Sequence, residues 1–383
     1  LFGYNVVTGL KGVYIVDVSA DPMHPDFIDV YDDIYFHDGF VRNDTLWVAE
    51  IYDGRFEIFD IADKSNFISL GYAGTPALTT HNCEPSADGK YLFTTDEFFT
   101  GYIGAFDISD FNDIKLLDKI KHGDVLQAVP PNVHIKDNFL VASHYSEGVV
   151  IIDATRPETL VETGHFDTSP AGPDSFFEGA WEVYPYLSSG LLLVSDIQEG
   201  LFVLEPEYKR AAYLEGIAAD AITFETKPNA LVQIMGTDIS DYTDLAGMFA
   251  MGTGVPGVYD IKISAEGCEL KVFEDISLLA GETMVLNALL DCGSTAVSEI
   301  GSMANIQMHY QAENKLMVLL CDWSYPFENV YCRIFDSDGR EVFKMHLPDD
   351  AERVEIPFAF PPGVYICSVQ SGNSFWQQKC MVY

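Results

Sequence analysis

The sequence lacks the short signatures of several common enzyme classes. It contains no Gly-x-Ser-x-Gly elbow, no P-loop, no dinucleotide-binding glycine pattern and no His-Glu-x-x-His pair. It also lacks an apolar run of about 18 residues, so it predicts no transmembrane segment. These absences exclude the corresponding hydrolases, nucleotide-binding enzymes and metalloproteases as simple interpretations.

Basic residues are scarce as well. The chain has 21 Lys and Arg against 59 Asp and Glu, which gives a formal net charge of −38 over 383 residues. This imbalance repels phosphate backbones and anionic membrane surfaces, so we expect no nucleic-acid partner. The same charge attracts cations, and a solvated acidic surface is the simplest explanation of it.

Cysteine is sparse and unpatterned. None of the seven cysteines forms a Cys-x-x-Cys pair or a Cys/His metal spacing, so buried thiols or one or two disulfides in the tail are both open. The sequence begins at Leu1 inside a repeat and has no signal peptide. We therefore expect the natural N-terminus to lie upstream, and the missing signal peptide decides nothing about export.

What the chain does have is a repeated strand-like pattern. Each copy has a glycine, then an apolar run rich in β-branched and aromatic residues, then an acid. The acids are Asp17, Asp60, Asp107, Asp153 and Glu205. Self-similarity at intervals of about 40–50 residues predicts a propeller or a solenoid. Aromatic residues make up 13% of the chain, which favours strands over helices.

The second repeat can be divided strand by strand. The expected strands are 35–42, 45–51, 56–61 and 66–72. Asn43-Asp44 and Asp53-Gly54 provide the turns between the first three. Four antiparallel strands in about 45 residues form one propeller blade. We predict such blades over residues 35–206, with the repeated acids at equivalent places.

The apolar-acid pattern resembles a known repeat. Val13-Tyr-Ile-Val-Asp-Val18 and its copies are similar to LVIVD repeats, the β-propeller repeat of the choice-of-anchor B family of bacterial surface proteins. Asp21-Pro22 and Pro25 also fit that repeat. The resemblance covers residues 1–208 with five motif copies. Closed propellers usually have six to eight blades, so it implies one or two further blades upstream.

Two smaller regions follow. Residues 211–291 contain short alternating strands separated by glycine-containing turns, which predicts a small β-sandwich. This region resembles the carboxypeptidase regulatory-like domain, a transthyretin-like accessory sandwich without peptidase residues. Residues 292–303 have linker composition.

The tail, residues 304–383, resembles the C-terminal sorting domain of type IX secretion substrates. The resemblance rests on Ile334-Phe-Asp-Ser-Asp-Gly-Arg340, on Gly363-Val-Tyr-Ile-Cys-Ser-Val369 and on Lys379 in the last strand. The usual Pro-Asn-Pro opening is absent. The resemblance implies a second β-sandwich, recognition by the type IX secretion machinery, and a secreted or outer-membrane cell-surface location in a Bacteroidota-type bacterium. We expect the turn at Gly339, Gly363 and the last strand to matter most for that recognition.

Polar residues recur at strand ends in the repeats. Histidines lie near the start of first strands, and acids or a histidine end second strands, so antiparallel pairing should bring them to one mouth of the propeller channel. The predicted ligand-binding set is His37, Glu50, His81, Asp96, Glu97, His134, His144 and Asp196. The metal candidates among them are His37, His81, His134 and Glu97, with a divalent cation such as calcium as the cofactor. The alternative is that these residues form structural hydrogen bonds between blades.

The sequence thus predicts an all-β chain: a partial β-propeller of four-stranded blades followed by two small β-sandwich domains. The implied function is a non-catalytic binding or adhesion platform for an extracellular protein or glycan. A metal-dependent hydrolase or lyase with its site at the propeller mouth is one alternative. A structural component of the cell envelope is another.

Overall fold

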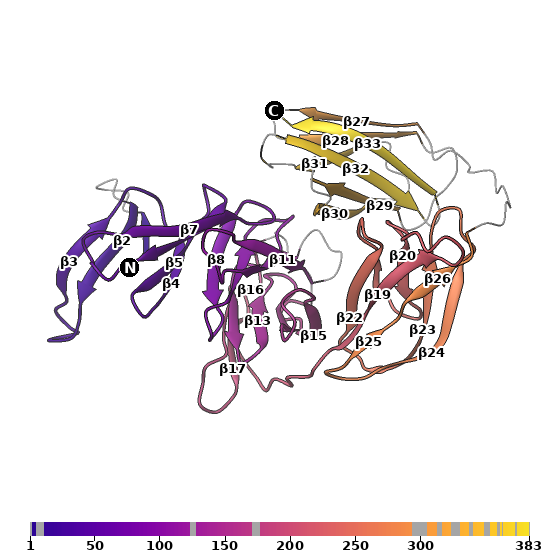
Figure 1. Cartoon of the computed structure of the whole chain (residues 1–383). Coiled ribbons are helices and arrows are strands. Elements are labelled where there is room, and N and C mark those ends of the chain that lie inside the picture. Colours follow the sequence, from indigo (N-terminus) through magenta and orange to yellow (C-terminus); the bar gives the residue numbers. More distant parts are fainter. Residues whose placement is uncertain are drawn as a thin grey trace. The chain divides into compact units, whose positions relative to one another are not determined.

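The structure is a computed structural model that places most of the chain. It describes residues 2–4, 11–122, 128–170, 177–292, 305–311, 316–322, 330–336, 340–347, 353–357, 361, 363–371 and 374–382. These residues form strands and no helix, and so no helix long and apolar enough to cross a membrane. The chain divides into two compact units, Leu1–Lys209 and Arg210–Tyr383 (Figure 1). The predicted all-β class is confirmed.

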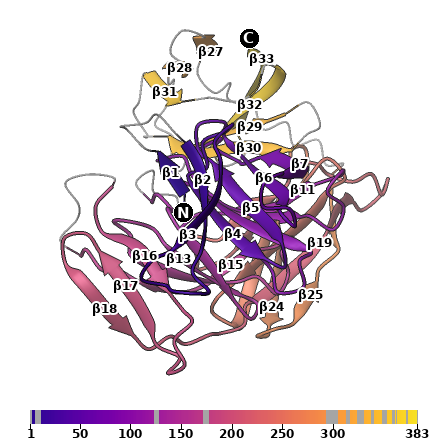
Figure 2. The ribbon, with the colours of Figure 1, turned by 90° about the vertical axis from the view of Figure 1, so that its left-hand side faces the viewer.

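The described residues of the first unit form five antiparallel sheets, numbered in chain order (Figure 2). The first sheet has β1 (Phe2–Tyr4), β2 (Lys11–Asp17) and β3 (Asp26–Tyr31). The second has β4 (Asp38–Arg42), β5 (Thr45–Glu50), β6 (Arg55–Asp60) and β7 (Ile68–Gly74). The third has β8 (Thr80–Pro85), β9 (Tyr91–Asp96), β10 (Ile103–Asp107) and β11 (Lys115–Ile120). The fourth has β12 (Val133–Lys136), β13 (Phe139–Ser143), β14 (Val149–Asp153) and β15 (Val161–Phe166). The fifth has β16 (Ala180–Tyr184), β17 (Leu192–Asp196) and β18 (Gly200–Leu204).

Consecutive sheets pack face to face through apolar side chains. Trp47 and Phe56 of the second sheet contact a layer of the third sheet that contains Leu92 and Phe106. The same kind of contact joins the first sheet to the second, the third to the fourth and the fourth to the fifth. Burial of each large side chain contributes about 1.5–3 kcal/mol. The predicted series of four-stranded propeller blades is thereby confirmed for the second, third and fourth sheets.

The repeated acid ends the third strand in the second, third and fourth sheets and ends β2 in the first sheet, and it closes a turn. In each case the carboxylate accepts a hydrogen bond from the backbone N–H two residues later, an arrangement that stabilises a turn. The pairs are Asp17 with Ser19, Asp60 with Ala62, Asp107 with Ser109 and Asp153 with Thr155. The acids therefore occupy equivalent places, as predicted, and their role is structural.

The repeated glycine also has a steric reason. Gly148 immediately precedes β14 with a φ of +74°, and a Cβ atom there would lie 2.1 Å from the carbonyl oxygen of Phe166. Gly12 has a φ of +98°, and its Cβ would lie 2.2 Å from the carbonyl oxygen of Tyr31. At both positions a side chain would meet backbone atoms of the next strand, so glycine is required.

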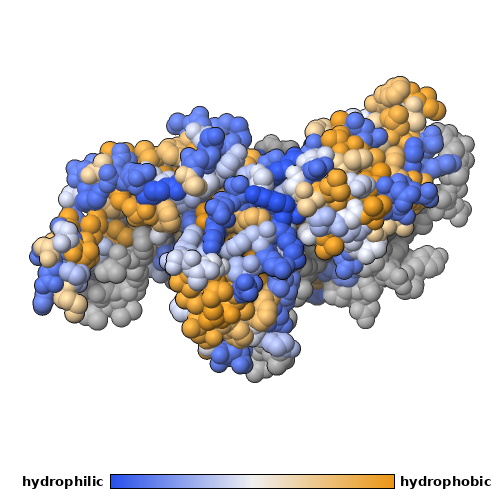
Figure 3. All heavy atoms as spheres, turned by 90° about the horizontal axis from the view of Figure 1, so that it is seen from below, coloured by the Kyte–Doolittle hydropathy of each residue, from blue (hydrophilic) through white to orange (hydrophobic). Residues whose placement is uncertain are grey.

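The fifth sheet differs from the fourth in what covers it. Val149 and Ile151 in β14 are 3% and 7% exposed, whereas Leu201 and Val203 in β18 are 66% and 55% exposed. Register with the preceding strand makes these positions equivalent, because Val149 pairs with Ser143 and Leu201 with Ser195. No described sheet of the first unit covers this outer face. One face of the whole molecule, with its separate apolar patches, is shown in Figure 3.

The second unit begins with two facing sheets. One contains β19 (Ala212–Asp220), β22 (Met248–Thr253), β25 (Thr283–Val285) and β26 (Ala288–Leu290). The other contains β20 (Leu231–Ile234), β21 (Ser240–Tyr242), β23 (Gly257–Ser264) and β24 (Lys271–Leu278). Their inner side chains share one apolar core. A disulfide joins Cys268 to Cys292.

The remaining sheets form the second sandwich. One contains β27 (Asn305–Gln311), β28 (Leu316–Asp322) and β31 (Arg353–Pro357). The other contains β29 (Val330–Phe335), β30 (Glu341–Leu347), β32 (Gly363–Ser371) and β33 (Ser374–Val382). Gly363 begins β32 and Lys379 lies within β33. Gly339 and linker residues 293–303 lie outside the described residues.

Candidate functional site

The structure brings together three of the predicted metal candidates. His37 precedes β4, His81 lies in β8 and Glu97 follows β9. One ligand atom from each lies within 4.8 Å of the others. The Nε2 atom of His81 is 3.5 Å from the Oε2 atom of Glu97, and the two imidazole centres are 4.3 Å apart. We call these three residues the His37–His81–Glu97 cluster.

A β-bulge helps to position His81. In the pairing of β8 with β9, Thr80 lies opposite Asp96 and Asn82 opposite Thr95, so His81 is the extra residue of the bulge. Bulges turn a side chain out of the regular alternation and recur next to functional sites. His37 reaches the same place because its N–H donates to the carbonyl of Ala49, which continues the β4–β5 pairing by one residue.

Each member of the cluster is also held by an outer group. The Nδ1 atom of His81 lies 2.7 Å from the carbonyl oxygen of Pro131 and donates to it. The hydroxyl of Tyr145 donates to Oε1 of Glu97 at 2.5 Å. The hydroxyl of Tyr35 lies 3.2 Å from Nδ1 of His37. Metal-binding histidines and carboxylates are usually oriented by such outer contacts, which leave the other ligand atom free for the ion.

The protonation state of His37 suits a metal ligand. Burial lowers the pKa of its imidazole, and the neighbouring His81 lowers it further. Neutral imidazole is the form that binds metals. The donor set is two nitrogens and one oxygen, which suits zinc and other divalent transition metals better than calcium, since calcium prefers six to eight oxygens.

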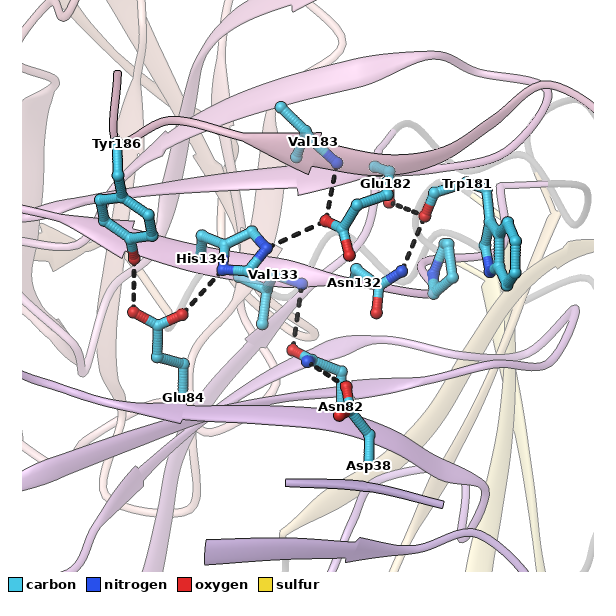
Figure 4. A network of polar contacts seen from close by, with 12 residues as sticks. Asp38, Asn82, Glu84, Asn132, Val133, His134, Trp181, Glu182, Val183 and Tyr186 are labelled. Atoms are coloured by element: carbon cyan, nitrogen blue, oxygen red, sulfur yellow. Dashed lines mark hydrogen bonds and ion pairs between the residues drawn. The ribbon is translucent and has the colours of Figure 1, made fainter. Parts of the chain in front are cut away.

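His134 lies in a different network (Figure 4). Its ring nitrogens bind Glu84 Oε2 at 2.8 Å and Glu182 Oε1 at 2.9 Å, and Tyr186 also donates to Glu84. Burial alone would lower the pKa of His134, but the hydrogen bonds to Glu182 and Glu84 outweigh it and raise the pKa to about 9. His134 is therefore a cation that links β8, β12 and β16, and it does not join the His37–His81–Glu97 cluster.

Amide side chains continue this link between sheets. Asn82 donates to Asp38 at 2.8 Å and accepts from the N–H of Val133 at 3.2 Å. Asn132 donates to the carbonyl of Trp181 at 2.7 Å (Figure 4). These contacts join the first strands of four successive sheets. They serve cohesion of the unit, the structural alternative that the sequence left open.

Two of the predicted acids anchor loops. Asp96 is buried and accepts from Thr75 and from the N–H groups of Ala77 and Thr79. Asp196 accepts from Thr168 and Ser169. Burial raises the pKa of Asp96, whereas hydrogen bonds outweigh burial at Asp196 and lower its pKa.

Glu50 and His144 occupy the matching positions in the second and fourth sheets. Burial raises the pKa of Glu50 to about 7, although Arg55 binds its carboxylate at 2.6 Å. His144 is fully buried, and neither ring nitrogen has a hydrogen-bond partner among the described residues. Neither residue belongs to the His37–His81–Glu97 cluster.

The outer groups of the cluster were not found from the sequence. Pro131 and Tyr145 belong to the fourth repeat, while His81 and Glu97 belong to the third. A shared pattern could have indicated the register: Asn82 and Asn132 each precede the apolar part of a first strand. When these two asparagines are aligned, the residue equivalent to His81 in the fourth repeat is Pro131 and not His134.

Comparison with known proteins gives distant structural likeness. No family model matches the chain, and no curated protein matches it. A protein from Lactobacillus plantarum is similar at a TM-score of 0.40 and 12% identity, over 93% of this chain and 98% of that chain. The β-propeller domain of Cps50 (Swd1) from Myceliophteria thermophila has a TM-score of 0.35 and 13% identity, over 90% and 95%. The dihydro-heme d1 dehydrogenase NirN has a TM-score of 0.33 and 10% identity, over 92% and 79%. These likenesses carry no argument about function.

Proposed function

We propose that the first unit is a binding platform that holds a divalent transition-metal ion on His37, His81 and Glu97, in a protein exported to the cell surface or medium. The observation that carries the metal site is the convergence of three ligand atoms within 4.8 Å, each residue having its other atom engaged by an outer group. The acidic chain adds a general attraction for cations.

Export rests on different observations. The LVIVD-like repeats and the sorting-domain-like tail resemble those of surface proteins and type IX secretion substrates. The Cys268–Cys292 disulfide supports an oxidising compartment, since such bonds are rare in the cytosol. Deleting residues 304–383 should therefore trap the protein in the periplasm. Equal surface or medium levels with and without the tail, measured by cell fractionation, would contradict the export proposal.

Zinc titration of the full chain tests the metal site. We expect His81→Ala and Glu97→Gln each to weaken the tightest zinc binding at least 100-fold in a competition assay with a chromogenic chelator. His24→Ala is the matched control, because the His24 side chain is 85% exposed and lies outside the cluster. Unchanged tight binding in both cluster variants would refute the site.

A metal-dependent hydrolase or lyase is the second candidate. Two imidazoles and one carboxylate are a donor set found in catalytic zinc sites, which keep one coordination position open. A zinc-loaded chain that hydrolyses activated esters, and loses that activity with Glu97→Gln, would favour catalysis over binding alone. The same turnover in the variant would remove this candidate.

A further inference from the structure

His144 stands out among the residues that end the second strands. The equivalent acids each have firm partners: Glu50 binds Arg55, and Asp96 binds Thr75. His144 is as deeply buried as these acids, yet both its ring nitrogens lack hydrogen-bond partners within the described part of the chain. A buried polar group left unpaired costs about 1–3 kcal/mol, so it calls for a physical explanation such as a bound ion or water.

Two further histidines lie beside it. The ring centre of His122 is 6.3 Å from that of His144, and the ring of His165 stacks on His122 at 4.1 Å. They come from different elements: His122 follows β11, His144 follows β13 and His165 lies in β15. Three of the nine histidines in the chain therefore meet at one place.

The hydrogen bonds of His122 and His165 leave one nitrogen of each ring available. Nδ1 of His122 binds Oε2 of Glu162 at 2.8 Å, and Nε2 of His165 donates to the carbonyl of Glu147 at 2.6 Å. The remaining nitrogens, Nε2 of His122 and Nδ1 of His165, have no hydrogen-bond partner among the residues that the structure describes. A carboxylate or a carbonyl on one nitrogen, with the other free, is the usual arrangement of metal-binding histidines.

We propose that His122, His144 and His165 form a second site for a divalent transition-metal ion, separate from the His37–His81–Glu97 cluster and independent of the function proposed above. Three imidazole nitrogens suit zinc, copper or nickel. Two imidazoles on one zinc ion have ring centres roughly 5 Å apart, between the two separations observed here.

This second site is less preformed than the first. Among the described residues, the ligand atoms that already lie within 4.8 Å of one another are those of His37, His81 and Glu97. The three other imidazoles must reorient to converge, and His165 can do so most easily because it is exposed. We therefore expect the second ion to bind more weakly than the first.

Zinc and copper titration of the full chain tests this proposal. The wild-type chain should bind two ions, and His165→Ala or His144→Ala should each remove the weaker one with at least a tenfold loss of affinity. His81→Ala should remove the tighter one and leave the weaker one in place. Copper loaded into His81→Ala should show nitrogen coordination by electron paramagnetic resonance, and His24→Ala should leave both ions unaffected.

The outcomes separate the two sites. One ion per chain that Glu97→Gln abolishes and His165→Ala leaves unchanged would overturn the second site and keep the first. One ion that His144→Ala and His165→Ala abolish, and Glu97→Gln leaves unchanged, would support the second site and overturn the first. Because His165 is exposed, its variant should fold, which circular dichroism can check. A wild-type chain that binds no ion would overturn both sites and leave a buried water as the explanation for His144.

Discussion

The third and fourth sheets of the first unit share a backbone plan but use it differently. The residue that ends the second strand is Asp96 in the third sheet and His144 in the fourth. The Asp96 carboxylate accepts three hydrogen bonds and fixes the segment Thr75–Thr79, whereas the His144 ring makes none with the described residues. Equivalent positions in a repeat therefore do not imply equivalent roles.

At the next position along the chain, the equivalent residues of the two sheets bind each other. Glu97 follows Asp96, and Tyr145 follows His144, so the two are equivalent by register, and they hydrogen-bond to each other. Glu84 and His134 form a second pair of equivalent positions that bind each other. When one sheet has a donor and the neighbouring sheet has an acceptor at the equivalent position, the two side chains can form a hydrogen bond that joins the sheets.

Substituting the residue that ends the second strand should give the largest contrast. Asp96→Ala leaves the backbone N–H groups of Ala77 and Thr79 unpaired and removes an acceptor of the Thr75 hydroxyl, so we expect a loss of about 4 kcal/mol in the free energy of unfolding. His144→Leu should be neutral or slightly stabilising in the presence of a chelator, because it removes an unpaired buried ring. Urea denaturation of the full chain measures both. Similar losses for the two variants would show that the sheets use this position alike.

The His134 network should give the second largest effect, and it depends on pH. Its pKa rises from 6.5 to about 9 on folding, so the network stabilises the fold fully below about pH 6.5 and loses this contribution as the pH rises through 9. A shift of that size corresponds to about 3 kcal/mol, and we expect about 2 kcal/mol because Glu182 is 45% exposed.

The measurement is the difference in unfolding free energy between the wild-type chain and His134→Gln at pH 6 and at pH 10. Taking the difference removes the titration of other groups. The advantage of the wild-type chain should shrink as the pH rises. A constant difference across this range would mean that His134 is neutral in the folded chain and that the Glu84–His134 pairing is not ionic.

The sequence predicts strands and turns better than it predicts which side chains of different sheets come into contact. Alternating apolar runs, Asp-Gly turns and the repeated acid depend on neighbouring residues, and they gave the strands and turns around Asp60 and Asp107. Which histidines converge depends on register. The bulge at His81 and the different lengths of the segments before β8 and β12 shift His134 three residues beyond the matching position, which Pro131 occupies. The equivalence of Asn82 and Asn132 indicates that shift, but only when the two first strands are aligned with each other.

Tyr145 should show how the fourth sheet supports the metal site on the third. Tyr145→Phe removes the hydrogen bond to Glu97 and nothing else at the cluster, so we expect zinc affinity at the first site to fall about tenfold. Stability without metal should change by about 1 kcal/mol or less. Tyr52→Phe is the control, since Tyr52 is 82% exposed. Equal zinc affinities for the wild-type chain and Tyr145→Phe would show that Glu97 needs no outer support.

We expect the smallest effect on stability at a position where the third and fourth sheets make the same kind of hydrogen bond. Thr95 donates to the carbonyl of Pro131 at 2.6 Å, and Ser143 donates to the carbonyl of Trp181 at 2.8 Å. Each carbonyl lies just before or within the first strand of the next sheet, and each has a second donor, His81 for Pro131 and Asn132 for Trp181.

Because the second donor keeps each carbonyl paired, Thr95→Val and Ser143→Ala should each cost only about 1 kcal/mol of unfolding free energy. Their effects on zinc binding should differ. Thr95→Val leaves the Pro131 carbonyl to His81 alone, so it perturbs the orientation of a metal ligand, whereas Ser143→Ala affects a carbonyl that touches no member of the cluster. We expect a change in zinc affinity for the first variant and none for the second. Equal zinc affinities for the two variants would mean that the Pro131 carbonyl orients His81 regardless of Thr95, and the third and fourth sheets would then use this hydroxyl for cohesion alone.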